Sequence, residues 1–220
     1  KKTTALHFDG TNYVTIPNIA GVIHGTEEAS IDFWVKKDLV QYGFIQLSGF
    51  ANTNGNLYPY DTETKVYLDI FKTSRLGPIY LNTTCLEWHH FAITTTPGAN
   101  GWKLYQDGEL IYSATGEPTV STDYLNFEIG RNSGNRYAVG AFRDIKLWDR
   151  ALTAEEIREN MHKPFYGNEK NLIGYWKFDS LDGIRDLTKN GNDGFISGNT
   201  PTVVDSVDIT LYYLAHKILR

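Results

Sequence analysis

The 220-residue chain contains one cysteine, Cys85, and one methionine. A single thiol cannot form a disulfide within the chain, and it cannot build a zinc site from several cysteine thiolates. No apolar run approaches the ~20 residues that a membrane-spanning helix needs, so we expect no membrane insertion. Basic residues are also scarce, with 21 Lys and Arg against 26 Asp and Glu. This balance argues against binding to the backbone of a nucleic acid.

Aromatic residues, by contrast, are abundant. They make up 14% of the chain and include 14 Tyr and 5 Trp. Aromatic side chains fit the half-buried surface of a pleated sheet, so core and cross-strand packing should account for most of them. The remainder suits a protein that binds glycans, because flat aromatic faces stack on sugar rings.

Apolar and polar residues alternate with a period of two through most of the chain, which predicts strands. Turn residues separate these runs, and Asp107-Gly108 between two alternating runs is the clearest hairpin signal. Apolar alternation predicts a buried face. The expected strands cover residues 5–8, 13–16, 30–36, 43–47, 65–71, 89–95, 102–106, 110–113, 125–129, 138–148 and 172–178. The expected core residues are Phe33, Val35, Phe91, Ile93, Leu104, Ile145, Leu147 and Trp176.

One short helix is expected near residues 153–162. Thr153 and Glu156 form a capping-box pattern, and Pro164 limits the helix on its far side. One helix among many short strands predicts an all-β fold, a two-sheet antiparallel jelly-roll sandwich. We expect this domain to cover residues 1–200, with 201–220 as a C-terminal extension or linker.

Four stretches carry a family resemblance. They are residues 5–14 (ALHFDGTNYV), 87–93 with 102–108 (EWHHFAI and WKLYQDG), 140–152 (GAFRDIKLWDRAL), and 172–179 with 190–194 (LIGYWKFD and NGNDG). In this order they resemble the concanavalin-A-like, laminin-G-like jelly-roll domains of bacterial surface and secreted proteins. The last stretch is most similar to surface proteins of glycan-foraging gut Bacteroidetes. The resemblance implies the same sandwich, but it does not define a function, because such folds carry lectins, carbohydrate-binding modules, adhesive domains and some glycosidases.

The sequence argues against an enzyme. A glycosidase on this fold needs two carboxylates ~5–9 Å apart that face the sugar. Asp32 and Asp69 each lie in an expected strand, but neither has an acidic neighbour two residues away. His89 and His90 are adjacent on a strand and should point to opposite faces, so they cannot easily chelate one ion.

Calcium is the inorganic ligand that the sequence favours. Ca²⁺ takes six to eight oxygens from carboxylates, amides and carbonyls. The turn from Asp9 to Asn12 offers such oxygens, and the family resemblance places the opening strand beside the strand that holds Asp144. We therefore expect Asp9, Asn12 and Asp144 to hold one structural Ca²⁺. The alternatives are an Asx turn for Asp9 and an ion pair with Arg143 or Arg150 for Asp144. The acidic stretch 179–186 is a second candidate without EF-hand spacing.

Glycan contacts are expected from two polar loops and one strand. The stretch 52–60 is rich in amides and carries two tyrosines that a loop does not need for a core. The loop 131–137 has similar chemistry, and the run 65–71 has a mixed polar and aromatic face. Ordinary polar loops with packed tyrosines are the alternative. The candidate ligand-binding residues are Asn54, Tyr58, Tyr60, Tyr67, Arg131, Asn135 and Tyr137.

These features predict a non-catalytic, lectin-like carbohydrate-binding module of a secreted or cell-surface protein. Its expected partner is a glycan or surface glycoconjugate, with neighbouring domains of a larger chain. The alternatives are a protein–protein adhesion or structural module and, less favoured, a glycoside hydrolase.

Overall fold

The structure, a computed structural model, describes residues 3–17, 19, 27–38, 45–46, 56–62, 65–69, 76–84, 86–115, 126–131 and 136–206. For residues 45–46, 56–62, 67–69 and 76–78 it describes the backbone alone.

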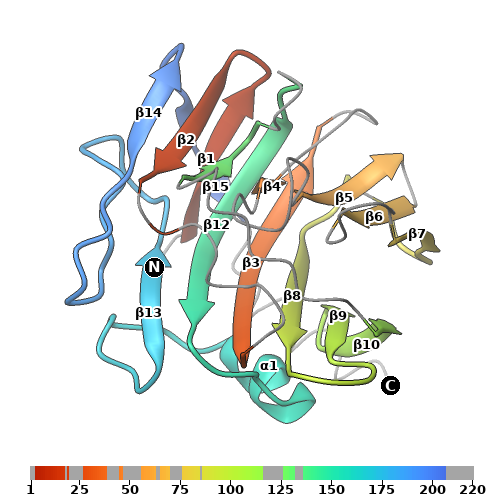
Figure 1. Ribbon diagram of the computed structural model, residues 1–220. Helices are drawn as coiled ribbons and strands as arrows, with labels where there is room; N and C mark the ends of the chain where they lie inside the picture. The colour runs from red at the N-terminus through yellow and green to blue at the C-terminus, as the bar shows by residue number, and fades with distance from the viewer. Residues whose placement is uncertain are drawn as a thin grey trace, which may run out of the picture.

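The described residues form two antiparallel sheets (Figure 1). The first, sheet A, has eight strands in the order β10-β9-β8-β3-β12-β1-β15, with β13 paired to β12. Its strands are β1 (Thr3–Asp9), β3 (Ala29–Lys37), β8 (His89–Thr95), β9 (Trp102–Gln106), β10 (Glu109–Ala114), β12 (Val139–Trp148), β13 (Leu172–Trp176) and β15 (Thr202–Ser206). Sheet B has seven strands in the order β14-β2-β11-β4-β5-β6-β7. These are β2 (Asn12–Ile16), β4 (Ile45–Gln46), β5 (Asn56–Thr62), β6 (Lys65–Asp69), β7 (Leu76–Tyr80), β11 (Phe127–Ile129) and β14 (Phe195–Gly198).

The main core lies between the two sheets, as the alternating pattern predicts. All eight expected core residues are buried, and none exposes more than 4% of its surface. Phe8 packs edge-on against Phe142 with ring centroids 5.6 Å apart, and Phe33 stacks on Phe91 at 6.1 Å. The expected antiparallel jelly-roll sandwich is therefore confirmed.

The Asp107-Gly108 turn joins β9 to β10, as expected. Both residues have positive φ angles, 51° and 82°, which a two-residue turn with the twist of a hairpin requires.

Two expectations about the chain's organisation need correction. Tyr58 and Tyr60 lie in strand β5 and not in a loop. Pro59 has no N–H to donate, and the pairing of β5 with β6 shifts between Tyr58 and Thr62, so the strand tolerates the proline at an irregularity. The sandwich also continues beyond the boundary expected at residue 200, because β15 pairs with β1 from Thr3↔Ser206 to His7↔Thr202.

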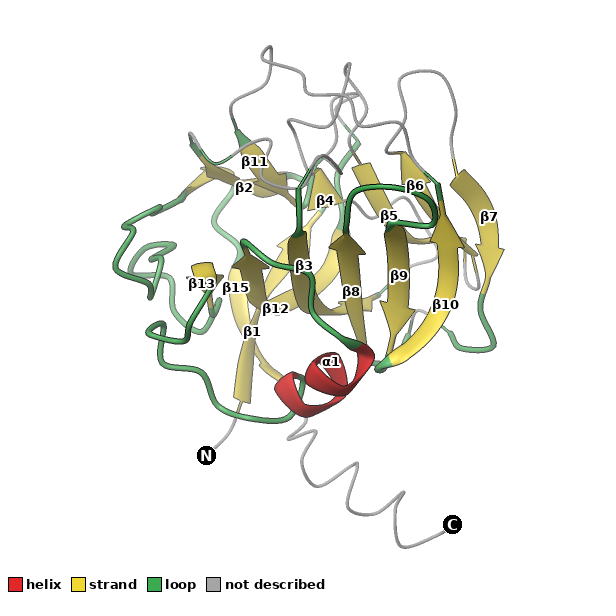
Figure 2. Cartoon of the chain, turned by 60° about the horizontal axis from the view of Figure 1, so that its bottom comes forward, coloured by secondary structure: helices red, strands yellow, loops and turns green. Residues whose placement is uncertain are grey.

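Helix α1 (Ala154–Asn160) lies against sheet A on the side away from the main core (Figure 2). Its capping box is formed as predicted: Thr153 Oγ1 accepts from the Glu156 amide at 3.2 Å, and the Glu156 carboxylate accepts from the Thr153 amide at 2.9 Å. Ile157 is fully buried in a second apolar cluster. That cluster also contains Ala92, Tyr105, Trp148, Leu152, Phe165, Leu172 and Tyr175.

A buried polar cluster lies in the same layer. The Asp32 carboxylate, 1% exposed, accepts hydrogen bonds from Lys146 Nζ, from His90 Nε2 at 3.0 Å and from Trp148 Nε1 at 2.8 Å. These four residues come from β3, β8 and β12, the three central strands of sheet A. Burial alone would raise the pKa of Asp32, but the Lys146 ammonium and the His90 hydrogen bond outweigh it and lower the pKa to about 2.

We expect Asp32→Asn to destabilise the fold by about 3 kcal/mol, because it leaves the buried Lys146 ammonium without its counter-charge. Urea unfolding at pH 7 measures the change. The double variant Asp32→Asn/Lys146→Met removes the stranded charge and should recover part of the loss. The exposed Asp149→Asn is the matched control, expected within about 0.5 kcal/mol of wild type. A single variant as stable as this control would contradict the role of Asp32.

Candidate functional site

The outer face of sheet B is the candidate site, because polar and aromatic residues gather on it. Val14, Ile16, Phe127 and Ile129 point into the main core. Successive strand residues alternate between faces, so Tyr13, Thr15 and Glu128 lie on the opposite, outer face.

The strand register extends this face across the sheet. Phe195 of β14 pairs with Thr15 of β2, and Thr15 pairs with Glu128 of β11. The same ladder row continues through Gln46 and Asn56 to Asp69. Residues directly opposite one another share a face, so the side chains of Thr15 and Glu128 lie on the same face as the half-exposed ring of Phe195 (52%).

Arg131 organises the centre of this surface. Its Nη2 donates to Glu128 Oε1 at 2.6 Å and its Nε to Oε2 at 3.1 Å, a two-point contact that fixes the guanidinium plane. The guanidinium carbon lies 3.9 Å from the centroid of the Tyr13 ring. Tyr137, which bridges to Arg131 across the backbone, places its ring 6.1 Å from that of Tyr13.

The electrostatics of the cluster keep Arg131 charged and its geometry fixed. Partial burial alone would lower the pKa of Arg131, but the hydrogen bonds and charge of Glu128, with a hydrogen bond to Tyr137, raise it. Because the Glu128 carboxylate balances this charge, the cluster presents planar faces and hydrogen-bonding edges with little net charge. Such a surface can stack against a flat ligand and bond to its polar rim.

The seven predicted ligand-binding residues have different outcomes. Arg131 and Tyr137 are brought together in the cluster described above. Tyr58 and Tyr67 face each other across β5 and β6, two and three strands from β11, and Tyr60 follows on β5; their side chains lie outside the described residues. Asn54 and Asn135 also lie outside them.

Sequence reasoning missed three residues of this face. Tyr13 and Glu128 were counted only as members of strands, and Phe195 lies in a strand that was not predicted. The alternation around Val14 and Ile129 could have placed Tyr13 and Glu128 on an outer face. Their pairing with Arg131 depends on strand order, which the alternation does not reveal.

The register separates the two carboxylates that were expected to share one Ca²⁺. Asp9 pairs with Val139, five residues before Asp144 on β12, so the two backbone positions are roughly 15 Å apart. Asp9 instead accepts from the amide and hydroxyl of Thr11 at 2.9 and 2.6 Å, which lowers the pKa of Asp9. Asn12 is fully buried, and its Oδ1 accepts from the Asp9 amide at 3.3 Å.

Asp144 forms the ion pair with Arg143 that the sequence offered as the alternative to a metal site. It lies at a bulge of β12 with a φ of 52°, pairs with the Arg143 guanidinium, and accepts from the Tyr175 hydroxyl at 2.9 Å. Elsewhere in the described part of the chain, no three His, Cys, Asp or Glu side chains gather as metal ligands. These donors therefore do not fit the calcium ion that the sequence favoured.

The two adjacent histidines serve different carboxylates. His89 Nδ1 lies 2.7 Å from Asp107 Oδ2, whereas His90 Nε2 contacts Asp32. Because Asp32 is ionised, His90 Nε2 donates the hydrogen bond. Burial lowers the pKa of His90 more strongly than Asp32 raises it, so the imidazole is neutral at pH 7. Burial also lowers the pKa of His162.

A two-sheet antiparallel sandwich with polar and aromatic residues on one outer sheet face is of the lectin-like jelly-roll class. A model of the concanavalin A-like lectin/glucanases superfamily matches residues 8–158. The chain therefore belongs to this superfamily. Among the described residues, no helix combines the length and the apolarity needed to cross a membrane.

Three known proteins that are similar to this chain share at most 24% identity with it. The rat "Sushi, von Willebrand factor type A, EGF and pentraxin domain-containing protein 1" is 24% identical over 213 residues, which are 89% of this chain and 6% of the rat protein. A Bacteroides ovatus protein to which carbohydrate binding has been ascribed is similar at a TM-score of 0.70 and 19% identity, over 94% of this chain and 61% of its own. The CBM40 module of a Ruminococcus gnavus IT-sialidase, solved with α2,3 sialyllactose, is similar at a TM-score of 0.53 and 15% identity. The match covers 73% of this chain and 97% of the CBM40 chain. At these identities the solved structures share the fold alone.

We expect stability to fall as the pH drops below about 6.5. The folded pKa of His90 lies below its unfolded value of 6.5, so the unfolded chain takes up a proton that the folded chain does not. The contribution of His90 to the free energy of unfolding falls by as much as about 1.4 kcal/mol for each pH unit below 6.5. Asp32 does not interfere, since its contribution is lost only as the pH falls from 3.8 through about 2.

Urea unfolding from pH 8 to pH 5 measures this slope. His90→Gln should flatten it, and His162→Gln should flatten it less, because His162 is only partly buried. Equal slopes for wild type and His90→Gln would show that the pKa of His90 is not lowered by folding.

Proposed function

We propose that the chain is a non-catalytic carbohydrate-binding module that recognises glycans on the outer face of sheet B. The observation that carries the proposal is the Arg131 cluster, in which Glu128, Tyr13 and Tyr137 hold a guanidinium and two aromatic rings in fixed positions. Rigid aromatic anchors lose little conformational entropy on binding, which favours them at a recognition surface.

Two further facts support a glycan as the ligand. A sugar ring has an apolar C–H face for stacking and a rim of hydroxyls for hydrogen bonds, and this sheet face offers both kinds of partner. The superfamily includes lectins, and structural neighbours include a module solved with sialyllactose and a protein to which carbohydrate binding has been ascribed. Laminin-G-like domains are typically extracellular, so we place this module in a secreted or cell-surface protein.

The carboxylates on the described face support binding without hydrolysis. Glu128 is 8% exposed, and both of its oxygens are engaged by Arg131. Asp32, the carboxylate in the middle of sheet A, is buried among Lys146, His90 and Trp148. Neither is available to protonate a glycosidic oxygen or to attack a sugar.

A glycan array on the purified chain tests this proposal. We expect binding to one or more glycans, and we expect Tyr13→Ala and Tyr137→Ala each to weaken it roughly tenfold, about 1.4 kcal/mol. Tyr166→Ala is the matched control, because Tyr166 is 75% exposed in the segment after α1 and not on sheet B. No bound glycan would refute the proposal and favour protein–protein adhesion. Equal losses of glycan affinity for all three variants would show that the glycan does not bind specifically at this face.

A further inference from the structure

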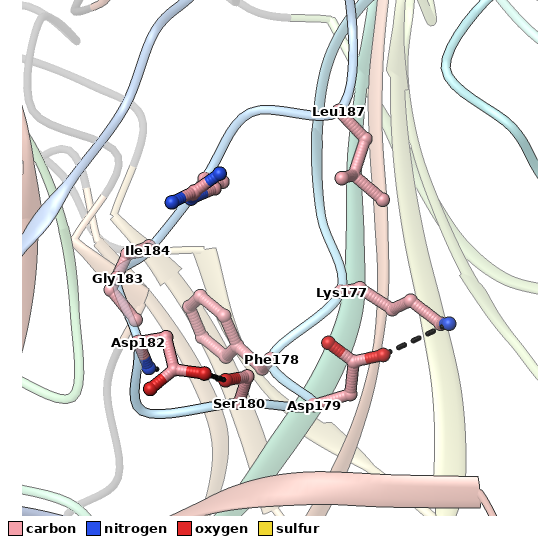
Figure 3. A pocket seen from close by; sticks show the side chains of 9 residues that line it. Lys177, Phe178, Asp179, Ser180, Asp182, Gly183, Ile184 and Leu187 are labelled. Atoms are coloured by element: carbon pink, nitrogen blue, oxygen red, sulfur yellow. Dashed lines mark hydrogen bonds and ion pairs between the residues drawn. The ribbon is translucent and has the colours of Figure 1, made fainter.

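The segment between β13 and β14 forms a pocket of its own. It has a volume of about 320 Å³, and all nine residues that line it lie between Lys177 and Leu187. The chain runs down one side through Lys177 and Asp179, turns at Ser180, and returns through Asp182 (Figure 3). This volume is at the lower end of small-molecule sites.

The first arm of the pocket is fixed to the sandwich. The Lys177 carbonyl accepts from the Asp144 amide at 3.3 Å. Phe178 is 4% exposed, with its ring 6.4 Å from that of Phe8. Its φ of 61° is strained for a residue with a side chain, and such strain persists only where the surroundings impose it.

The second arm is fixed by a carboxylate. Asp186 accepts from the amides of Tyr175, Thr188 and Asn192, with distances of 2.9–3.0 Å, and also from the Thr188 hydroxyl and the Asn192 side chain. The Leu187 amide donates to the Tyr175 carbonyl at 2.9 Å, and the Ile184 carbonyl accepts from Gly194 at 2.7 Å. Because both arms are held, the pocket is formed before any ligand arrives, which lowers the cost of binding.

The charges that line the pocket balance. Lys177 pairs with Asp179 at 2.9 Å, and the Asp182 carboxylate accepts from Ser180 Oγ at 3.1 Å. Arg185 is exposed and makes no ion pair with another described residue. A ligand here meets acceptors and donors together, with the half-exposed side chain of Leu187 (44%) beside them. An anion would face two carboxylates, and a cation would face two cations.

We propose that this pocket is a second binding site, separate from the Arg131 cluster, and that it takes a single neutral sugar residue. Hydroxyls of the sugar donate to the Asp182 carboxylate and accept from the Arg185 guanidinium, while an apolar ring face lies on Leu187. A neutral polyol uses both kinds of group at no cost in net charge, and one ring fits the volume.

Amide chemical shifts of the isotope-labelled whole chain test this site. The probes are D-glucose, D-galactose, D-mannose and L-arabinose, compared with glucuronate, glucosamine and glycine as anionic, cationic and zwitterionic ligands. We expect a neutral sugar to shift the amides of residues 180–187 with a millimolar Kd and the charged probes to bind more weakly. Arg185→Ala and Asp182→Asn should each weaken that sugar at least tenfold, whereas the exposed Lys189→Ala should not.

The outcomes separate this site from the first. Tyr137→Ala should leave the pocket response unchanged, so a negative glycan array with a positive pocket response refutes only the sheet B site. The pocket proposal fails if no neutral sugar shifts these amides, if a charged probe binds more tightly, or if Arg185→Ala, folded as judged by its melting temperature, binds like wild type.

Discussion

The Asp32 carboxylate determines how the outer face of sheet A is covered. It lies on the outer face of sheet A, where a charged group would ordinarily face water. It is instead buried by Lys146, His90 and Trp148, and Phe165 covers the cluster with its ring 5.0 Å from Lys146 Nζ. A buried ion pair requires complete satisfaction of its hydrogen bonds, because removal of one partner leaves an uncompensated charge. Sheet A must therefore keep the layer formed by α1 and the segment after it.

Carboxylates elsewhere show the same division of roles. Asp186 accepts five hydrogen bonds within the fold, and both oxygens of Asp144 and of Glu128 are engaged by neighbouring side chains. Each stabilises a neighbouring surface: Asp186 fixes one arm of the pocket, and Glu128 fixes the guanidinium of the sheet B cluster. Residue type alone would have made all of them candidates for metal or acid–base chemistry. The number of donors around each oxygen is what separates a structural carboxylate from one that is free to act.

The sequence predicted the strands of the core, the capped helix and the hairpin at Asp107, because each depends on local periodicity or on a short motif. It failed where the outcome depends on register. Asp9 and Asp144 do lie on neighbouring strands, but a shift of five residues along β12 separates them. The irregular strand through Pro59 and the short strands β14 and β15 were missed, because turn-type residues or short length masked their alternation. Of the site, Arg131 and Tyr137 were identified from loop composition, whereas Tyr13 and Phe195 required the strand order of sheet B.

The two candidate sites differ in how the fold supplies their rigidity. The Arg131 cluster rests on a regular sheet, where flat rings and a paired guanidinium form an extended surface suited to several units of a chain. The pocket between Lys177 and Leu187 lies in irregular backbone that Asp186 and the strained Phe178 hold in place. A concave pocket encloses one unit and discriminates by hydrogen bonds, whereas a flat face gains mainly from stacking. Because each is held by contacts internal to the fold, neither needs the other in order to form.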